Sequence, residues 1–178
     1  MKRLLTAICC LTLLCVPALS QNKAAHPANA KGAMSDQQFV DLAAQTDMVE
    51  ANLGQLAGNV AESQQVKDYG QTLVTDHTND YQQLTAAAKQ ANLNVPTAID
   101  AAHNKKMIEP FQKLKGAAFD RKYIHEMVAG HEQAIQIYKK ESTGAENDSI
   151  KTYAQTALPV LEKHLSAAKD LEKAKPSK

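Results

Sequence analysis

The chain has 178 residues, contains no tryptophan and carries a formal net charge of +1. This length fits one domain with flanking segments, and a near-neutral chain without a basic cluster lacks the electrostatic footprint of a nucleic-acid-binding protein. The sequence also lacks the strongly charged amphipathic segment expected of a helix that lies on a membrane surface.

Residues 1–20 have the layout of a secretory signal peptide. Lys2 and Arg3 precede a short apolar run, and the small-residue exit Ala18-Leu19-Ser20 follows it. We therefore predict cleavage near Ser20, a periplasmic or secreted mature protein, and no transmembrane span in that mature protein. The alternative is an uncleaved anchor helix, which the shortness of the apolar run disfavours.

All the cysteines lie within this signal, at Cys9, Cys10 and Cys15. The mature protein therefore has no thiol, which excludes disulfides and cysteine-based metal or redox sites. Attachment to the membrane through a lipid on Cys15 is disfavoured, because Leu14 stands where the processing enzyme prefers a small residue. Loss of the signal also removes Lys2 and Arg3, which takes the net charge from +1 to −1.

A flexible tether is predicted over residues 21–34, which are rich in Ala, Asn, Lys and Pro and poor in large apolar side chains. The first helix follows, because Ser35 and Gln38 form a capping box and apolar residues then recur with helical spacing to about Ala61. Its apolar face holds Phe39, Ala43, Leu53, Ala57 and Val60.

Ser63 is positioned to cap a second helix that continues to about Ala91. Its apolar stripe is Val66, Leu73, Leu84 and Ala88. Residues 92–116 then form a long connector, in which Thr97 together with Asp100 can cap a short helix.

A third helix is predicted over residues 117–143 and a fourth over residues 147–173, with Asn147 or Asp148 as its cap. A disordered tail over residues 174–178 ends the chain. The third helix turns Ile124, Met127, Val128, Ile135 and Tyr138 to one face, and the fourth turns Ala157, Leu161, Ala168 and Leu171.

No strand-like alternation competes with these helical periods, so the predicted fold is all-α. Four long amphipathic helices over residues 35–173 predict a single four-helix bundle domain. The long connector, with its short helix between helices two and three, favours the ferritin-like topology with one crossover. The alternative is an up-and-down bundle in which the long connector is an extended loop that contains a short helix.

Each helix places one ligand-type side chain at the centre of its apolar stripe. His77, for example, lies four residues after Leu73 and seven before Leu84, and such offsets return to one helical face. The corresponding residues on the other helices are Glu50, His131 and His164. All four are near the middles of their helices, so they can converge at one level; we call this set the Glu/His layer.

Three imidazoles and a carboxylate are ligands that suit zinc, iron or copper. The Glu/His layer is therefore a candidate metal site, and Asp76 beside His77 is a candidate partner that orients a ligand. Two alternatives remain open. The layer can be a metal-free polar network, because buried charges need partners, and Asp76 can simply be exposed.

The sequence resembles a family of secreted bacterial proteins known as a domain of unknown function, whose members are often labelled membrane or outer-membrane proteins. The resemblance lies in "FVDLAAQTDMVEANLGQLA", "VKDYGQTLVTDHTNDYQQL", "AAFDRKYIHEMVAGHEQAI" and "YAQTALPVLEKHLSAA". Its matched positions are Glu50, Asp76, His77, Phe119, Asp120, Tyr123, His131, Pro159 and His164. The resemblance implies a ferritin-like four-helix bundle in the cell envelope and no established activity.

One departure from the di-iron bundles limits the chemistry. Those bundles carry Glu-x-x-His on two helices, whereas the residue three positions before each inward histidine is Val74, Val128 or Leu161. The sequence therefore cannot build the usual dinuclear carboxylate site, and we do not expect iron storage or oxygen activation at a di-iron centre.

Three functions fit these patterns. The first is an exported envelope protein that binds a transition metal through the Glu/His layer, for metal buffering or a stress response. The second is a metal-free structural or interaction module with an unidentified envelope partner. The third is a mononuclear metalloenzyme that uses the same layer. It is disfavoured because the sequence shows neither the open coordination position nor the entry path that such an enzyme needs, and no catalytic residue set or other cofactor site is recognisable.

Overall fold

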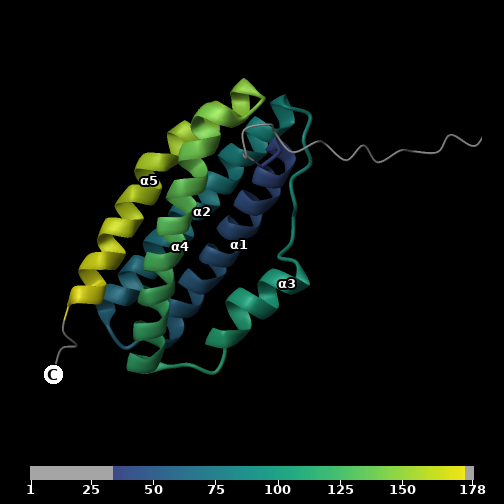
Figure 1. Cartoon of the computed structure of the whole chain (residues 1–178). Helices are drawn as coiled ribbons and strands as arrows, with labels where there is room; N and C mark the ends of the chain where they lie inside the picture. Colours follow the sequence, from purple (N-terminus) through teal and green to yellow (C-terminus); the bar gives the residue numbers. More distant parts are fainter. Residues whose placement is uncertain (1–33, 175–178) are drawn as a thin grey trace, which may run out of the picture.

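The computed structural model describes residues 34–174, and this part of the chain is all-α, with no strand. The long helices α1 (Asp36–Val60), α2 (Gln64–Gln90), α4 (Gly116–Gly144) and α5 (Asp148–Lys173) pack as a bundle (Figure 1). The predicted signal peptide, residues 21–33 of the tether and residues 175–178 of the tail lie outside the described residues. None of the described helices is long and apolar enough to cross a membrane.

The predicted helix starts agree with the structure to within a residue or two, although the capping bonds differ. At α1 the capping box is complete, since the Ser35 side chain accepts from the Gln38 backbone and the Gln38 side chain accepts from the Ser35 backbone. Ser63 and Asn147 occupy the cap positions of α2 and α5, but neither side chain makes a capping hydrogen bond.

Carboxylates from other helices bind the backbone at both ends of the bundle, and they reveal its topology. Asp36, at the start of α1, accepts from the backbone N–H groups of Glu146 and Asn147 at 2.9 and 2.8 Å. Asp120, near the start of α4, accepts from the backbone N–H of Ser63 at 2.8 Å. Thus α4 begins beside the α1–α2 turn and ends beside the start of α1. The connector must run the length of the bundle, which confirms the ferritin-like crossover and excludes the up-and-down alternative.

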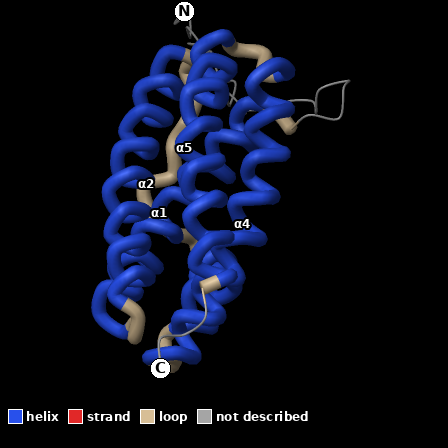
Figure 2. The backbone as a smooth tube through the Cα atoms, turned by 90° about the vertical axis from the view of Figure 1, so that its left-hand side faces the viewer, coloured by secondary structure: helices blue, strands red, loops and turns tan. Residues whose placement is uncertain are grey.

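The connector runs alongside α1, as Figures 1 and 2 show. The Gln37 side chain donates to the Asn94 carbonyl at 2.8 Å. Further along α1, the Gln45 side chain donates to the Ala98 carbonyl at 2.9 Å and accepts from the Asp100 backbone at 3.0 Å. Two long-range anchors on one helix therefore fix the path of a segment that otherwise has little regular structure.

The short helix α3 (Ala101–His103) is capped by Asp100, whose side chain accepts from the His103 backbone at 2.8 Å. The predicted capping role of Thr97 is wrong, because α3 begins four residues later and Asp100 alone supplies the cap. A π-helical turn (Asn104–Ile108) and a 3₁₀ turn (Glu109–Phe111) follow. They bury Ile108 and Phe111, which attach the connector to the core.

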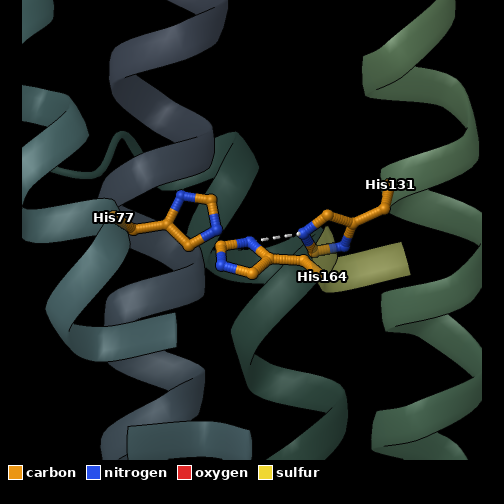
Figure 3. A group of neighbouring side chains, drawn as sticks. All are labelled: His77, His131 and His164. Carbon is orange, nitrogen blue, oxygen red and sulfur yellow. Dashed lines mark hydrogen bonds between the residues drawn. The ribbon is translucent and has the colours of Figure 1, made fainter. Parts of the chain in front are cut away.

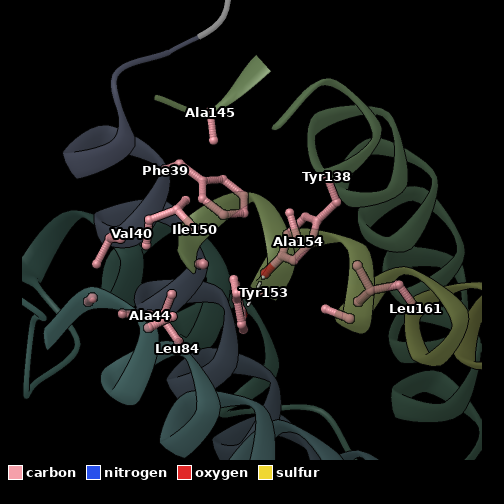
Figure 4. Packing of buried hydrophobic residues seen from close by; sticks show 14 of the residues in the cluster. Phe39, Val40, Ala44, Leu84, Tyr138, Ala145, Ile150, Tyr153, Ala154 and Leu161 are labelled. Atoms are coloured by element: carbon pink, nitrogen blue, oxygen red, sulfur yellow. Dashed lines mark hydrogen bonds between the residues drawn. The ribbon is translucent and has the colours of Figure 1, made fainter. Parts of the chain in front are cut away.

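The buried apolar side chains form two clusters, one on each side of the Glu/His layer. One contains Phe39, Leu84, Tyr138 and Ile150, and its interior is drawn in Figure 4. The other cluster contains Leu53, Leu73, Phe119, Tyr123 and Ala168. Along every long helix the layer residue lies between the segments that supply the two clusters, so a polar slab separates two apolar cores.

Helices α1 and α2 make backbone contact at Gly54 and Gly70. A Cβ atom on Gly54 would lie 2.5 Å from the Gly70 carbonyl oxygen, and one on Gly70 would lie 2.9 Å from the Ala57 Cβ. Only glycine permits this approach. Gly54 comes one turn after Glu50, so the close packing also brings the α1 half of the layer towards His77.

Candidate metal centre

All four residues of the Glu/His layer meet in the bundle interior, one from each long helix. Glu50 is on α1, His77 on α2, His131 on α4 and His164 on α5, and their exposed fractions are 6, 2, 0 and 2%. One ligand nitrogen from each histidine lies within 4.8 Å of the other two. Figure 3 shows the three rings turned towards one another. The rotational phases inferred from the sequence therefore agree with the structure.

The distances between the inward atoms match those around a small metal ion. His77 Nε2 lies 3.0 Å from Glu50 Oε2, His131 Nε2 lies 3.5 Å from the same oxygen, and His131 Nε2 lies 3.3 Å from His164 Nδ1. Zinc binds imidazole nitrogen at about 2.0–2.1 Å, so adjacent ligands of a tetrahedral ion are about 3.3–3.4 Å apart. These three contacts have about that spacing, and the three histidine nitrogens as a set lie within 4.8 Å of one another.

Each histidine directs its other ring nitrogen to an acceptor outside the layer. His131 Nδ1 donates to the Met127 carbonyl at 2.8 Å, and a carbonyl can only accept. His77 Nδ1 lies 2.9 Å from an Asp47 oxygen, and His164 Nε2 lies 2.8 Å from an Asp76 oxygen. These contacts assign the N–H groups to the outer nitrogens. The inner nitrogens of His131 and His164 are hydrogen-bonded to each other at 3.3 Å, whereas in a neutral His77 ring the inner nitrogen presents a lone pair to the centre.

Two buried atoms at the centre are unpaired within the described residues. Glu50 Oε2 and His77 Nε2 are only 3.0 Å apart, yet both are buried and neither has a hydrogen-bond partner of acceptable geometry. Buried lone pairs that face one another are unfavourable unless a cation lies between them. A metal ion, or protons held by the rings, would satisfy this arrangement.

The Glu50 carboxyl is ionised in this environment. Burial by itself raises the pKa of Glu50, but the positive charges of His131 and His77 outweigh burial and lower the pKa to about 2. The layer therefore contains a fixed negative charge, as a cation site requires.

The surroundings act on the histidines in opposite directions. For His77, burial lowers the pKa, but Glu50 and Asp47 outweigh burial and raise it well above its usual value. For His164, burial dominates and lowers the pKa, although the hydrogen bond to Asp76 opposes this. The proton-binding affinity of the layer thus differs from ring to ring.

Asp76 does contact the layer, through a histidine on another helix. Its carboxylate binds His164 on α5 rather than the adjacent His77, and it is 30% exposed. Residue 76 points about 100° away from residue 77 around the helix axis, and α5 packs against α2. Asp76 therefore connects the layer to solvent.

Sequence reasoning missed Asp47, which holds His77 in place and is only 2% exposed. Burial raises the pKa of Asp47 to about 7, and the hydrogen bond from His77 opposes this. The signal was present: Asp47 lies four residues after Ala43 and three before Glu50, on the same helical face.

Two tyrosines flank the layer on the side of the α1–α2 turn, and the analysis of helical faces overlooked both. The Tyr69 hydroxyl donates to the His164 carbonyl at 3.3 Å. The Tyr123 side chain is wholly buried, and its hydroxyl has no hydrogen-bond partner among residues 34–174. Burial, and then the negative charge of Glu50, raises the pKa of both phenols, so both remain neutral.

Comparisons with known proteins agree with this architecture. Residues 21–171 match a family described as a domain of unknown function (DUF4142). No curated protein matches the chain. A solved structure described as CopM in the Cu(II)-bound form is similar, with 15% identity, a TM-score of 0.65, and coverage of 79% of this chain and 97% of that chain. At this identity the similarity supports the helical fold.

Proposed function

Because the chain belongs to the DUF4142 family, a domain of unknown function, its role must be inferred from its own residues, and we propose that it binds a transition-metal ion. Glu50, His77, His131 and His164 are the proposed ligands. Asp76 and Asp47 orient two of the rings by accepting their outer N–H groups, a common arrangement around metal-bound histidines.

One observation carries this proposal: ligand atoms from four helices converge in the bundle interior, and two of them, Glu50 Oε2 and His77 Nε2, are buried 3.0 Å apart without a hydrogen-bond partner in the described residues. A structural polar network would be expected to pair donors with acceptors throughout. Here the outer ring nitrogens bind Asp47, Met127 and Asp76, while Glu50 Oε2 and His77 Nε2 remain unpaired at the centre. That distribution favours a cation as the missing partner.

Copper in its divalent form is the first ion to test. The donor set has three nitrogens and one oxygen, and such sites bind Cu(II) more tightly than the other divalent first-row ions. The protein of similar fold was solved with Cu(II) bound. The mature chain contributes no thiolate, so the layer lacks the thiolate ligands that favour Cu(I).

The test is metal analysis of the mature chain purified without a histidine tag. We expect one Cu(II) per chain by elemental analysis and nitrogen hyperfine structure from imidazole in the electron paramagnetic resonance spectrum. His131→Asn should abolish stoichiometric binding. His125→Asn is the matched control, because His125 is 73% exposed and pairs with Glu172 at the surface. The proposal fails if the two variants bind copper equally.

We also propose that the bundle acts outside the cytoplasm, where it would buffer a metal ion or serve a stress response. The arrangement of residues 1–20 supports export, with cleavage near Ser20. The mass of the protein recovered from the envelope and the medium tests this proposal: a chain that retains residues 1–20 would contradict cleavage.

A metal-free module of the envelope is the second candidate. The pairs His77–Asp47 and His164–Asp76 favour it, because they satisfy part of the layer without an ion. In that case the layer would fix how the helices align, as buried polar groups do in some proteins. Metal ions would then leave the melting temperature unchanged, whereas a bound ion at one hundred times its Kd adds about 2.7 kcal/mol of stability.

A further inference from the structure

The hydroxyl of Tyr123 is a donor without an acceptor in the interior of the bundle. The residue has no exposed surface, and no polar atom in the described structure accepts its hydrogen bond. Leaving a buried donor unpaired is unfavourable, so an orphaned group of this kind often marks the position of a ligand or water molecule. Phenylalanine would fill the same space without that penalty.

The orphaned hydroxyl belongs to the apolar cluster on the α1–α2-turn side of the Glu/His layer, within range of the charge of Glu50, which adds to burial in raising the pKa of Tyr123. Tyr123 packs in the same cluster as Val49 and Leu53, which flank Glu50 on α1. It is on α4, eight residues before His131 and on the same face of the helix. Glu50 Oε2 is the complementary orphan, a buried acceptor without a donor.

The neighbouring tyrosine shows what a satisfied hydroxyl looks like here. The rings of Tyr69 and Tyr123 are in edge contact, with centroids 6.2 Å apart. The Tyr69 hydroxyl donates to the His164 carbonyl, so its hydrogen bond is complete within the protein. The two neighbouring tyrosines thus differ in whether the hydroxyl is hydrogen-bonded within the protein. This difference makes Tyr69→Phe the matched control for Tyr123→Phe.

We propose that the Tyr123 hydroxyl donates to a water molecule that is bound to the metal ion beside Glu50, so that the ion keeps one exchangeable coordination position. Small anions with a lone-pair donor atom, such as azide, could replace that water. This inference rests on the proposed metal site. According to this inference, the metal ion binds one small exogenous ligand in addition to its four protein ligands.

The position of the hydroxyl supports donation to a ligand rather than direct coordination. Tyr123 lies in an apolar cluster near the negative charge of Glu50, and both disfavour a phenolate. A neutral phenol is a hydrogen-bond donor and a poor metal ligand. A metal-bound water would supply the acceptor that the buried Tyr123 hydroxyl lacks.

The experiment is an azide titration of the Cu(II)-loaded mature chain, followed by the azide-to-copper charge-transfer absorption and by electron paramagnetic resonance. We expect saturable binding of azide to the wild type. Tyr123→Phe should bind azide at least about tenfold more weakly, the effect typical of removing a group that supports a metal site. Tyr69→Phe, the matched control, should change azide affinity by less than about twofold.

Stability separates this role from simple core packing. Metal-free Tyr123→Phe should melt at the same temperature as the wild type or higher, because the substitution removes an unpaired buried group. Equal azide affinity in Tyr123→Phe and wild type would overturn the inference, as would a copper-loaded wild type that does not respond to azide; in both cases the proposed metal site would stand. A wild type that binds no copper would overturn both proposals.

Discussion

At the scale of single residues, the two nitrogens of each imidazole have different roles. The outer nitrogen binds an acceptor that orients the ring, and the inner nitrogen faces the centre of the layer, where a ligand would bind. Asp47, Met127 and Asp76 hold the outer nitrogens of the three rings. An oriented ring loses little rotational freedom when a ligand binds, and a carboxylate partner makes the inner nitrogen a stronger base. The acceptors around the layer should therefore matter nearly as much as the ligands.

The Asp47–His77 pair provides the first test. Asp47→Asn keeps the size of the side chain but replaces the carboxyl group that holds the His77 ring by an amide, and we expect Cu(II) affinity to fall about 10–100-fold. Competition titration against a chelator measures this change. Asp100→Asn is the control, because Asp100 binds the exposed His103 in a similar pair at 2.9 Å, away from the layer. Equal affinity in wild type and Asp47→Asn would contradict the prediction.

Glu50 should make the metal-free protein sensitive to acid. Its pKa is about 2 in the folded chain, below the ordinary value of 4.5, chiefly because His131 and His77 outweigh burial. A carboxyl with a lowered pKa contributes stability that is present above about pH 4.5 and is lost as the pH falls towards 2, on the order of 3 kcal/mol in total.

Urea unfolding of the metal-free protein at a series of pH values measures this contribution. Glu50→Gln should remove most of the pH dependence in that window, because glutamine does not titrate. Wild type and Glu50→Gln would lose stability in parallel below pH 4.5 if the interaction of Glu50 with the histidines were not significant.

At the scale of helices, the contact between α1 and α2 sets the width of the layer on one side. Gly54 and Gly70 let the two backbones touch, and Glu50 and His77 project from these two helices with their inward atoms 3.0 Å apart. Any side chain at the contact would force the helices apart. The side chains of Glu50 and His77 are short, so such a shift would also separate their inward atoms.

The glycines of α1 supply a matched pair of variants. Gly54→Ala places a methyl group against the Gly70 carbonyl, which we expect to destabilise the bundle by about 1–3 kcal/mol and to weaken metal binding. At Gly58 an added Cβ meets no atom within 4 Å, so Gly58→Ala should stabilise α1 by up to about 1 kcal/mol. Denaturant unfolding measures both, and similar effects at the two positions would refute the role of the close contact.

At the scale of the whole molecule, a polar slab between two apolar clusters is an uncommon way to build a core. The clusters share the same four long helices, so neither can open without disturbing the other. The crossing connector and the carboxylates of Asp36 and Asp120 add contacts at both ends. All of these interactions lie within residues 34–174, which we propose as the independently folding domain.

Truncation tests that proposal. A chain that begins at Met34 should unfold in one cooperative transition, with the same midpoint as a chain that begins at Gln21, because the capping box and both end contacts are retained. Circular dichroism during thermal unfolding measures the midpoint. Two separate transitions, or a loss of stability on truncation, would show that the domain has other boundaries.

The sequence alone was enough to place the long helices and to turn Glu50, His77, His131 and His164 inwards. A helix repeats every 3.6 residues, so spacing along the chain determines which face each side chain occupies. The capping box at Ser35 similarly depends on residues only three positions apart. These features are local, and local geometry is largely set by the order of the amino acids.

Only the tertiary structure decided which side chains meet across helices. Asp76 binds His164 rather than its neighbour His77, Asp47 holds His77, and the Tyr123 hydroxyl is left without an acceptor. Each outcome depends on which helices are neighbours and how closely they approach, as at Gly54 and Gly70. The spacing of residues within one helix contains no information on either quantity, because both arise when four separate faces pack together.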